Sequence, residues 1–228
     1  MGFVTFAGIG VLAGGQISLF IGALIIAGLN ASSPRWRGLL LAAGAVIKPQ
    51  ALLPAPVALI ARRDWRTIGW AAAAAAALLL LSACAFGIDV WLRWATEVPR
   101  FHDYLVSRGI DQMDVGMYGL ARSVGLPGWI FICGVPLGIA TSWLVFRRQA
   151  APVDQYAAFA ASTVLLSPYT LYYDLAGLTF ACLAMLLDRE RSPLIWLAAA
   201  LVVSSVFANI GIVLLAAALS AEAVQRSR

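Results

Sequence analysis

Apolar residues fill long segments of this chain, and short polar connections separate them. A helix needs roughly 20 apolar residues to cross the hydrocarbon core of a bilayer, and only 67–87, 127–146 and 169–187 reach that length comfortably. The pattern predicts an all-α fold, a polytopic integral membrane bundle in which several helices are short and broken or re-entrant. The apolar segments lie at about 3–14, 16–31, 36–47, 51–61, 67–87, 127–146, 153–166, 169–187, 193–208 and 210–225.

Composition supports a membrane protein. Apolar residues make up 62% of the 228 residues, charged residues make up 12%, and the mean hydropathy is +0.87, which is typical of a chain in lipid. The net charge of +5 does not indicate nucleic-acid binding, because the arginines lie at the ends of apolar segments, where they orient membrane helices. Cys84, Cys133 and Cys182 show no ligand spacing, so we expect no disulfide, metal site or other cofactor.

The arginines also predict the orientation in the membrane. Those in short connections and at the tail face the cytoplasm by the positive-inside rule, and the long polar stretch at about 88–126 is then external. Its first part, IDVWLRWATEVPRFHDYL, is typical of an amphipathic helix at the headgroup level. We therefore expect a multi-pass protein of the inner (plasma) membrane, with a single transmembrane domain over 1–228 and an external loop at 88–126.

Lys48 is the only lysine of the chain and the only charge between Gly38 and Ala61. A charged side chain at the bilayer centre costs from about 3 to more than 10 kcal/mol, so it needs a partner, a water-filled cavity or a function. Because arginines flank 37–62 on both sides, its two short helices form a hairpin with Lys48-Pro49-Gln50 at the tip. A helix of about 12 residues rises roughly 18 Å, which places this tip beyond mid-membrane.

Similar breaks occur at 167–169, at 14–16 and near Asn209. Non-helical backbone at membrane depth is tolerated only where it is buried in protein or lines a cavity. We therefore expect three or four polar tips to converge on one externally facing cavity.

The residues at these tips suit a phosphate. Lys48 is a compact cation that binds phosphate as a point charge, and a cavity open to the outer face could accept the phosphate of a lipid carrier. Gln16, Gln50 and Ser167 could donate hydrogen bonds to the same group or to a sugar. The alternative is that Lys48 only pairs with Asp174 or snorkels, and that the breaks are packing kinks.

Four titratable residues are further candidates. Asp174, in SPYTLYYDLAGL, is an acid at membrane depth, which is normally paired or protonated. Asp111 and Asp114 are external carboxylates near the expected cavity mouth, where either could act as general base or contact sugar hydroxyls. His102, the only histidine, could also be catalytic. Solvation in a loop or at the membrane interface is the alternative for Asp111, Asp114 and His102.

Three motifs carry a resemblance to a known family. GGQISLFIGALIIAGL, WRGLLLAAGAVIKPQALLPAPVALIARRDWR and LLSPYTLYYDLAGL follow the order seen in glycosyltransferase family 87, whose members are membrane enzymes of the GT-C class. The resemblance implies transfer of a sugar, typically mannose, from a polyprenyl-phosphate donor on the outer face to a lipid or glycan hydroxyl, without a nucleotide sugar and usually without a metal. The residues carried over as cavity or donor-phosphate residues are Gln16, Lys48, Ser167, Tyr173 and Asp174.

The chain also departs from the family pattern. Enzymes of this class generally hold a catalytic aspartate in a first external loop near the N-terminus, and no residue here matches it. The chain therefore resembles the C-terminal portion of such an enzyme. Mannosyltransferase members often carry a W-D-H-H-like run where this sequence has Leu171-Tyr172-Tyr173-Asp174. The implied mechanism is inversion, in which a carboxylate deprotonates the acceptor hydroxyl while the lipid phosphate leaves.

Two other functions fit the same pattern. Short helices broken at polar tips are also typical of transporter sites, so a small transporter or a lipid-binding membrane module without catalysis is one alternative. A catalytically inactive remnant of a glycosyltransferase is the other.

Overall fold

The structure, a computed structural model, describes residues 17–188 and 190–226, and most of these are helical. No strand forms within these ranges, although an isolated β-bridge joins Asp114 to Leu171. The all-α membrane bundle expected from the sequence is confirmed.

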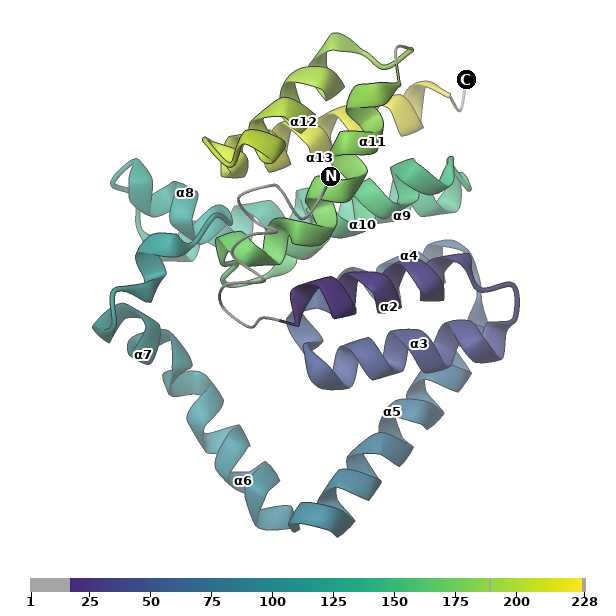
Figure 1. Cartoon of the computed structure of the whole chain (residues 1–228), viewed down its shortest axis with the longest axis vertical. Helices are drawn as coiled ribbons and strands as arrows, with labels where there is room; N and C mark the ends of the chain where they lie inside the picture. Colours follow the sequence, from purple (N-terminus) through teal and green to yellow (C-terminus); the bar gives the residue numbers. More distant parts are fainter. Residues whose placement is uncertain (1–16, 189, 227–228) are drawn as a thin grey trace.

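The α-helices in Figure 1 are α2 (Ser18–Asn30), α3 (Pro34–Ile47), α4 (Pro54–Ala61), α5 (Trp65–Phe86), α6 (Ile88–Glu97), α7 (Phe101–Ser107), α8 (Met117–Ser123), α9 (Gly134–Arg147), α10 (Pro152–Leu166), α11 (Ala176–Leu187), α12 (Pro193–Ser204) and α13 (Ala208–Gln225). The 3-10 turns are η2 (Pro49–Leu52), η3 (Val98–Arg100), η4 (Ile110–Met113), η5 (Gly128–Cys133) and η6 (Tyr172–Leu175).

Prolines and one acidic cap set where several helices begin. Proline starts α3, α4, α10 and α12, where its missing N–H breaks no hydrogen bond. Asp64 caps α5, because its Oδ1 accepts a hydrogen bond from the backbone N–H of Thr67 at 3.1 Å. Burial opposes ionisation of Asp64, but hydrogen bonds from Thr67 and Arg37 outweigh it and lower the pKa of this carboxyl.

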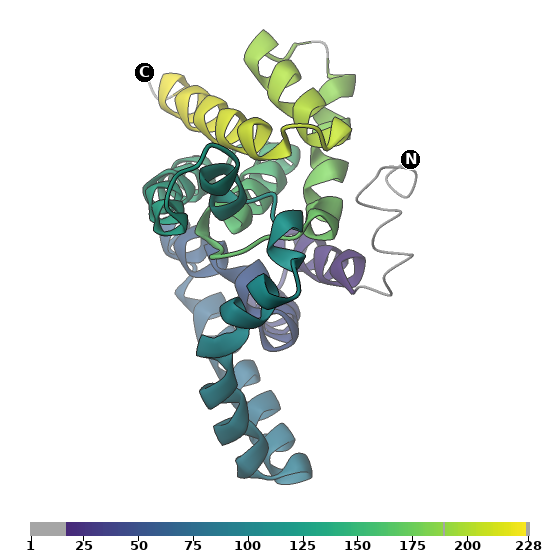
Figure 2. The ribbon, with the colours of Figure 1, turned by 90° about the vertical axis from the view of Figure 1, so that its left-hand side faces the viewer.

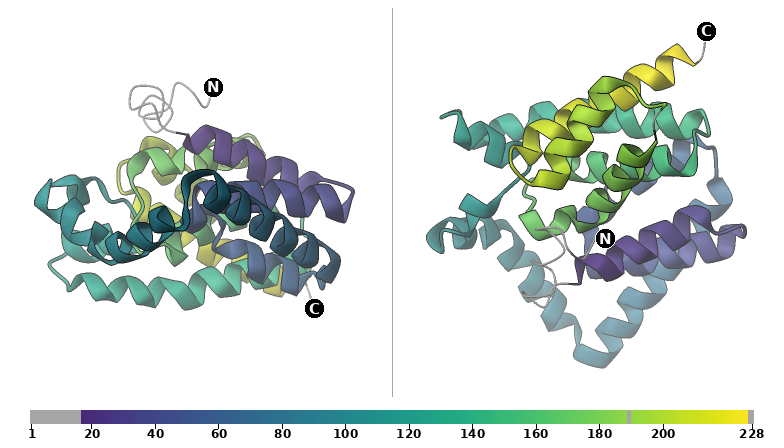
Figure 3. Two further views of the ribbon diagram at one scale, coloured as in Figure 1. Left: turned by 90° about the horizontal axis from the view of Figure 1, so that it is seen from below. Right: turned by 45° about the horizontal axis from the view of Figure 1, so that its top comes forward.

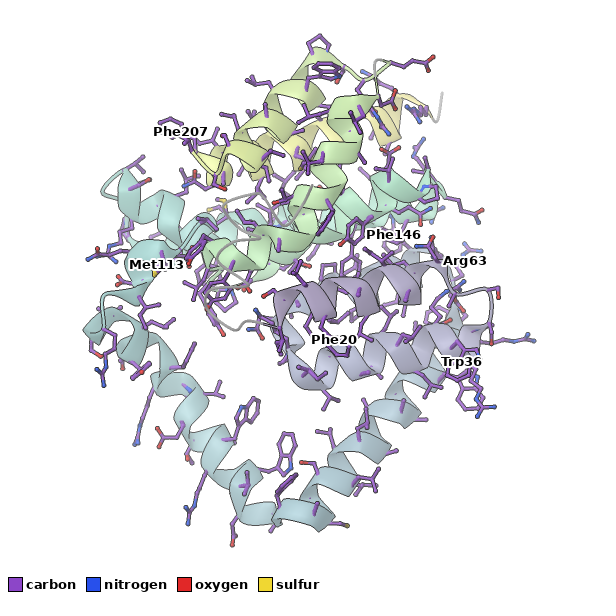
Figure 4. The ribbon with its side chains drawn as sticks, in the orientation of Figure 1. Phe20, Trp36, Arg63, Met113, Phe146 and Phe207 are labelled. Carbon is purple, nitrogen blue, oxygen red and sulfur yellow. The ribbon has the colours of Figure 1, made fainter. Side chains whose placement is uncertain are left out.

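The helices pack as two groups that share an interface. Helices α9 to α13 enclose one core of aliphatic and small side chains, and α2, α3 and α4 enclose a second. Phe146 of α9 and Phe159 of α10 are fully buried where the groups meet, with ring centroids 6.3 Å apart. Figure 4 labels Phe146 at this interface, and Figure 3 shows both groups from two further directions. The interface continues to the ends of α2 and α11, where the cavity described below lies.

Three helical stretches of the described chain are long and apolar enough to cross a membrane: Trp65–Phe86, Gly128–Arg147 and Ala208–Gln225. The first two confirm the spans expected over 67–87 and 127–146. The expectation for 169–187 is wrong, because an extended segment and the turn η6 take up its first residues and leave α11 with 12 residues. The last span is α13, which the sequence pattern had grouped with the short segments.

Helices α5 and α6 form a V that projects from the bundle (Figures 1 and 2). Leu80 and Leu81 of α5 are each 66% exposed, which suits contact with lipid, and no residue of α6 is buried. The amphipathic helix expected in the 88–126 stretch is present, but the turn η3 at Pro99 divides it into α6 and α7, because proline lacks the N–H that an uninterrupted helix needs.

The ends of the 37–62 segment lie together, as a hairpin requires. Arg37 at the start of α3 forms an ion pair of 2.5 Å with Asp64, beyond the end of α4. Arg62 contacts Gln155 in the first turn of α10, and the next residue back, Asp154, pairs with Arg191. The described arginines of these connections therefore gather at one end of the bundle. Lys48, which ends α3, and the break that follows α10 lie at the opposite end.

Gly38 allows α3 and α5 to approach closely. A Cβ at Gly38 would lie 2.6 Å from the Cβ of Trp70 and 2.8 Å from the backbone nitrogen of Ala71, and the latter cannot move aside. We expect Gly38→Ala to lower the free energy of unfolding by about 1–3 kcal/mol, the usual effect of overpacking. Thermal unfolding in detergent measures this change.

Gly69 of α5 provides the control for that substitution. A Cβ at Gly69 meets no atom within 4 Å. Gly69→Ala should therefore raise the free energy of unfolding by up to about 1 kcal/mol, because alanine has the higher helix propensity. Equal effects of the two substitutions would contradict the close approach at Gly38.

Candidate functional site

Lys48 and Asp174, which are far apart in the sequence, meet where two helix breaks come together. Lys48 ends α3 with an extended backbone (φ −143°, ψ 79°) before Pro49 starts η2. Asp174 lies in η6, between the break after α10 and the start of α11. The Lys48 ammonium forms an ion pair with Asp174 Oδ1, and each side chain is 16% exposed. The alternative interpretation of Lys48, that it only pairs with Asp174, predicts this ion pair.

Ser18 completes this polar cluster, and the sequence analysis missed it. Its Oγ donates a hydrogen bond of 3.0 Å to Asp174 Oδ1 and accepts one of 3.4 Å from Lys48 Nζ. Ser18 is buried in the first turn of α2. Its position two residues after the G-G-Q break was the one available signal, because the residues that follow a break at membrane depth face the same cavity.

Two tyrosines border the cluster. The ring centroid of Tyr173 lies 5.7 Å from Lys48 Nζ, within the range of a cation–π interaction. The hydroxyl of Tyr169 accepts a hydrogen bond of 3.0 Å from Gln50 Nε2. Ser167, which is buried, donates to the backbone oxygen of Tyr169. The tip at 48–50 and the tip at 167–174 are therefore joined by side-chain bonds.

A cavity with a volume of about 60 Å³ lies among these groups. Such a space holds a few water molecules or a phosphate-sized group, and not a whole lipid-linked sugar. Its polar lining comprises Ser18, Lys48, Gln50, Tyr156, Thr163, Ser167, Tyr169, Thr170 and Asp174.

The Lys48 end of the cavity lies well away from the arginine-rich end, although the lining extends along α10 to Tyr156. Helix α10, with 15 residues, rises about 22 Å from that end to Ser167. This rise exceeds half of a hydrocarbon core of about 30 Å, and the depth of the tip in a membrane stays a prediction.

Not all expected tips converge here. Gln16 and the break at 14–16 lie outside the described residues. The break expected near Asn209 occurs at 205–207, where Ser205 and Phe207 have positive φ angles of 59° and 57°. Phe207 is 64% exposed and lies at the edge of the bundle in Figure 4, and this turn does not line the cavity. Within the described chain, the cavity is therefore formed by two tips, the starts of α2 and α11, and one face of α10.

Asp114 ties the 88–126 stretch to the 167–174 tip. Its Oδ1 accepts hydrogen bonds from the backbone N–H groups of Gly116 at 2.7 Å and Gly119 at 3.2 Å. Its Oδ2 accepts one from Thr170 N at 3.0 Å. Burial raises the pKa of this carboxyl, the three hydrogen bonds oppose the rise, and the negative charge of Asp174 adds to it.

The other two candidates of the 88–126 stretch are Asp111 and His102. Asp111 is buried and forms an ion pair with Arg122, and His102 lies in α7. Neither Asp111 nor Asp114 lines the cavity, and Asp174 is the one carboxylate that does so in the described part of the chain. Asp111 thus joins two parts of the 88–126 stretch through Arg122, and Asp114 joins this stretch to the 167–174 tip.

We expect Asp114→Asn to remove a pH dependence from stability. Because the pKa of Asp114 is raised in the folded protein, the folded protein holds this proton more tightly than the unfolded protein does. The contribution of Asp114 to stability is therefore largest below its ordinary pKa of about 3.9 and declines as the pH rises through the raised value. Thermal unfolding between about pH 4 and pH 8 should show the wild type losing stability relative to Asp114→Asn with rising pH. A constant difference would contradict the raised pKa.

The described residues hold no group of three or more His, Cys, Asp or Glu side chains placed to bind a metal ion. The three cysteines are free thiols, of which Cys84 and Cys133 are exposed and Cys182 is buried.

Comparison with known proteins identifies the family. No curated protein and no solved structure matches the chain significantly. Residues 3–168 match the sequence profile of glycosyltransferase family 87. The match includes Lys48, Gln50 and Ser167 and ends just before Tyr169, so that Tyr173 and Asp174 lie beyond it. Because the match covers well over half of the sequence, the chain belongs to glycosyltransferase family 87.

Proposed function

We propose that this membrane glycosyltransferase takes a hexose, mannose in the first instance, from a polyprenyl-phosphate donor at the outer face of the inner membrane and passes it to a lipid or glycan hydroxyl. The observation that carries the proposal is the position of Lys48. It is a largely buried cation between short apolar helices, and it faces a phosphate-sized cavity together with Ser18 and Asp174. A lysine ammonium in a low-dielectric cavity stabilises the charge that develops on a leaving phosphate.

The ion pair of Lys48 with Asp174 is compatible with this role. In the empty site, Asp174 supplies the negative charge that a cation at this depth needs. A phosphate replaces that charge when the donor binds. Asp174 keeps two hydrogen bonds after losing Lys48, one from Ser18 Oγ at 3.0 Å and one from Leu171 N at 3.3 Å. Exchange of one anion for another therefore leaves each hydrogen-bonding group with a partner, although Asp174 then lies beside the phosphate without a cation of its own.

The proposed reaction is an inverting displacement. The acceptor oxygen forms a bond to the anomeric carbon, the bond from that carbon to the phosphate oxygen breaks, and the acceptor proton passes to a carboxylate. Inversion places that carboxylate on the face of the sugar opposite the phosphate. Asp174, the one carboxylate among the described residues that line the cavity, contacts Lys48 and so lies on the phosphate side, where it positions Lys48.

Transfer with two donor classes tests the proposal. The purified protein in liposomes should transfer mannose from polyprenyl-phosphate mannose and should not transfer it from a nucleotide-linked mannose. Transfer from the nucleotide sugar would overturn the donor assignment. Binding of polyprenyl phosphate without transfer would favour the lipid-binding module.

A further inference from the structure

A second and larger hollow adjoins the polar cavity. It has a volume of about 1050 Å³, and we name it the aromatic groove. One wall consists of residues at the Lys48 tip and the other of aromatic residues from α6, α7 and η5. The side chains that define it are Ile47, Leu53, Trp94, Phe101, Trp129 and Phe131.

The groove and the cavity share two lining residues, Gln50 and Tyr169. The hydrogen bond between them, 3.0 Å from Gln50 Nε2 to Tyr169 Oη, lies at the boundary between the two spaces. On the groove side, the ring of Phe101 packs against the ring of Tyr169 with centroids 5.3 Å apart. The hydrogen bond between the two shared residues is neutral, and such a bond is worth about 1 kcal/mol.

The two spaces differ sharply in charge. The cavity presents Lys48 and Asp174, whereas Glu97 is the one charged residue of the groove lining and pairs with Arg100 at 3.3 Å. Several groove side chains are exposed, among them Trp94 at 53% and Trp129 at 66%. A ligand that fits both spaces has one small anionic group and a long apolar chain attached to it.

We propose that the aromatic groove binds the isoprenoid chain of the donor, and that the Gln50–Tyr169 hydrogen bond must open for the donor phosphate to reach Lys48. This inference rests on the proposed function, because it identifies the chain from the phosphate that Lys48 binds. The groove holds the chain by apolar contact with the aromatic side chains. Tyr169 is then a positioning residue that controls entry of the headgroup.

Binding of sugar-free polyprenyl phosphates of two chain lengths tests the groove. Trp94→Ala and Trp129→Ala should weaken binding of a long-chain phosphate by about tenfold and leave binding of a two-isoprene phosphate unchanged. Trp36→Ala is the matched control, because Trp36 is 60% exposed and lies at the arginine-rich end. It should change neither affinity. Equal affinities of wild type and groove variants for the long chain would overturn the proposal.

Tyr169→Phe tests the boundary without removing the ring. This variant loses the hydrogen bond with Gln50 and should raise the association rate of the long-chain phosphate severalfold. An unchanged association rate would overturn the role of the hydrogen bond.

Lys48→Gln separates this inference from the proposed function. It should weaken binding of both phosphates equally, because both carry the same headgroup. If Lys48→Gln weakens both while the groove variants weaken neither, the groove assignment fails and the phosphate site stands. If Lys48→Gln changes neither affinity, the proposed function itself fails.

Discussion

Replacing Lys48 by glutamine should lower the rate of sugar transfer by at least about 100-fold, the usual effect of removing a group that stabilises developing charge. Glutamine keeps similar length and can donate hydrogen bonds, but it carries no charge for the leaving phosphate. Lysine acts here as a point charge, so Lys48→Arg should retain only part of the activity, because a planar guanidinium is larger than the ammonium that the small cavity accommodates. Transfer from a polyprenyl-phosphate sugar in liposomes measures both effects.

Arg66→Gln provides the matched control for the loss of one positive charge. Arg66 is exposed in the first turn of α5, and this substitution should leave transfer near the wild-type rate. The amount of each variant in the membrane fraction shows whether insertion is preserved. Wild-type turnover by Lys48→Gln would refute the assigned role of Lys48.

Replacing Asp174 by alanine should both destabilise the protein and lower the rate of transfer, because Asp174 positions Lys48. It leaves Lys48 without its anionic partner at membrane depth and removes the acceptor for Ser18. Loss of one member of a buried ion pair costs about 3–5 kcal/mol, and we expect a smaller cost, on the order of 2 kcal/mol, because both side chains are partly exposed. Thermal unfolding in detergent and the transfer assay measure the two consequences.

The double variant Lys48→Gln with Asp174→Asn separates stability from function. It replaces the ion pair by two neutral amides that can hydrogen bond to each other, so it should regain most of the stability lost in Asp174→Ala. It should remain inactive, because the positive charge for the phosphate is still missing. Recovery of both stability and transfer would show that the pair is purely structural, as the alternative interpretation of Lys48 holds.

The sequence allowed part of the site to be predicted. Lys48, Gln50, Ser167 and Asp174 are predicted because a polar residue in an apolar segment is costly unless it has a partner or a function. Tyr173 is predicted from the resemblance to the family. The structure brings all five to the two joined tips. Their roles in transfer stay a prediction that the experiments above address.

Other features of the site depend on contacts between distant segments. Ser18 lies at a helix start that has no charge or proline to mark it, and the contact with Asp174 shows that this residue, two positions after the G-G-Q break, belongs to the site. Asp114 was selected as a possible base, yet its carboxylate is occupied by three backbone N–H groups, one of them 56 residues away at Thr170. Spacing in the sequence cannot reveal such partners, because they depend on how the 88–126 stretch returns to the bundle.

What the sequence by itself determined is the class of fold, two of the three candidate spans and the hairpin around Lys48. These follow from local and one-dimensional properties: apolar length, proline breaks and the distribution of arginine. Only the tertiary structure decided that Lys48 pairs with Asp174, that the tip near Asn209 stays apart, and that an aromatic groove adjoins the polar cavity. These depend on which helix faces meet in three dimensions, and the burial of Phe146 and Phe159 between the two helix groups fixes that arrangement.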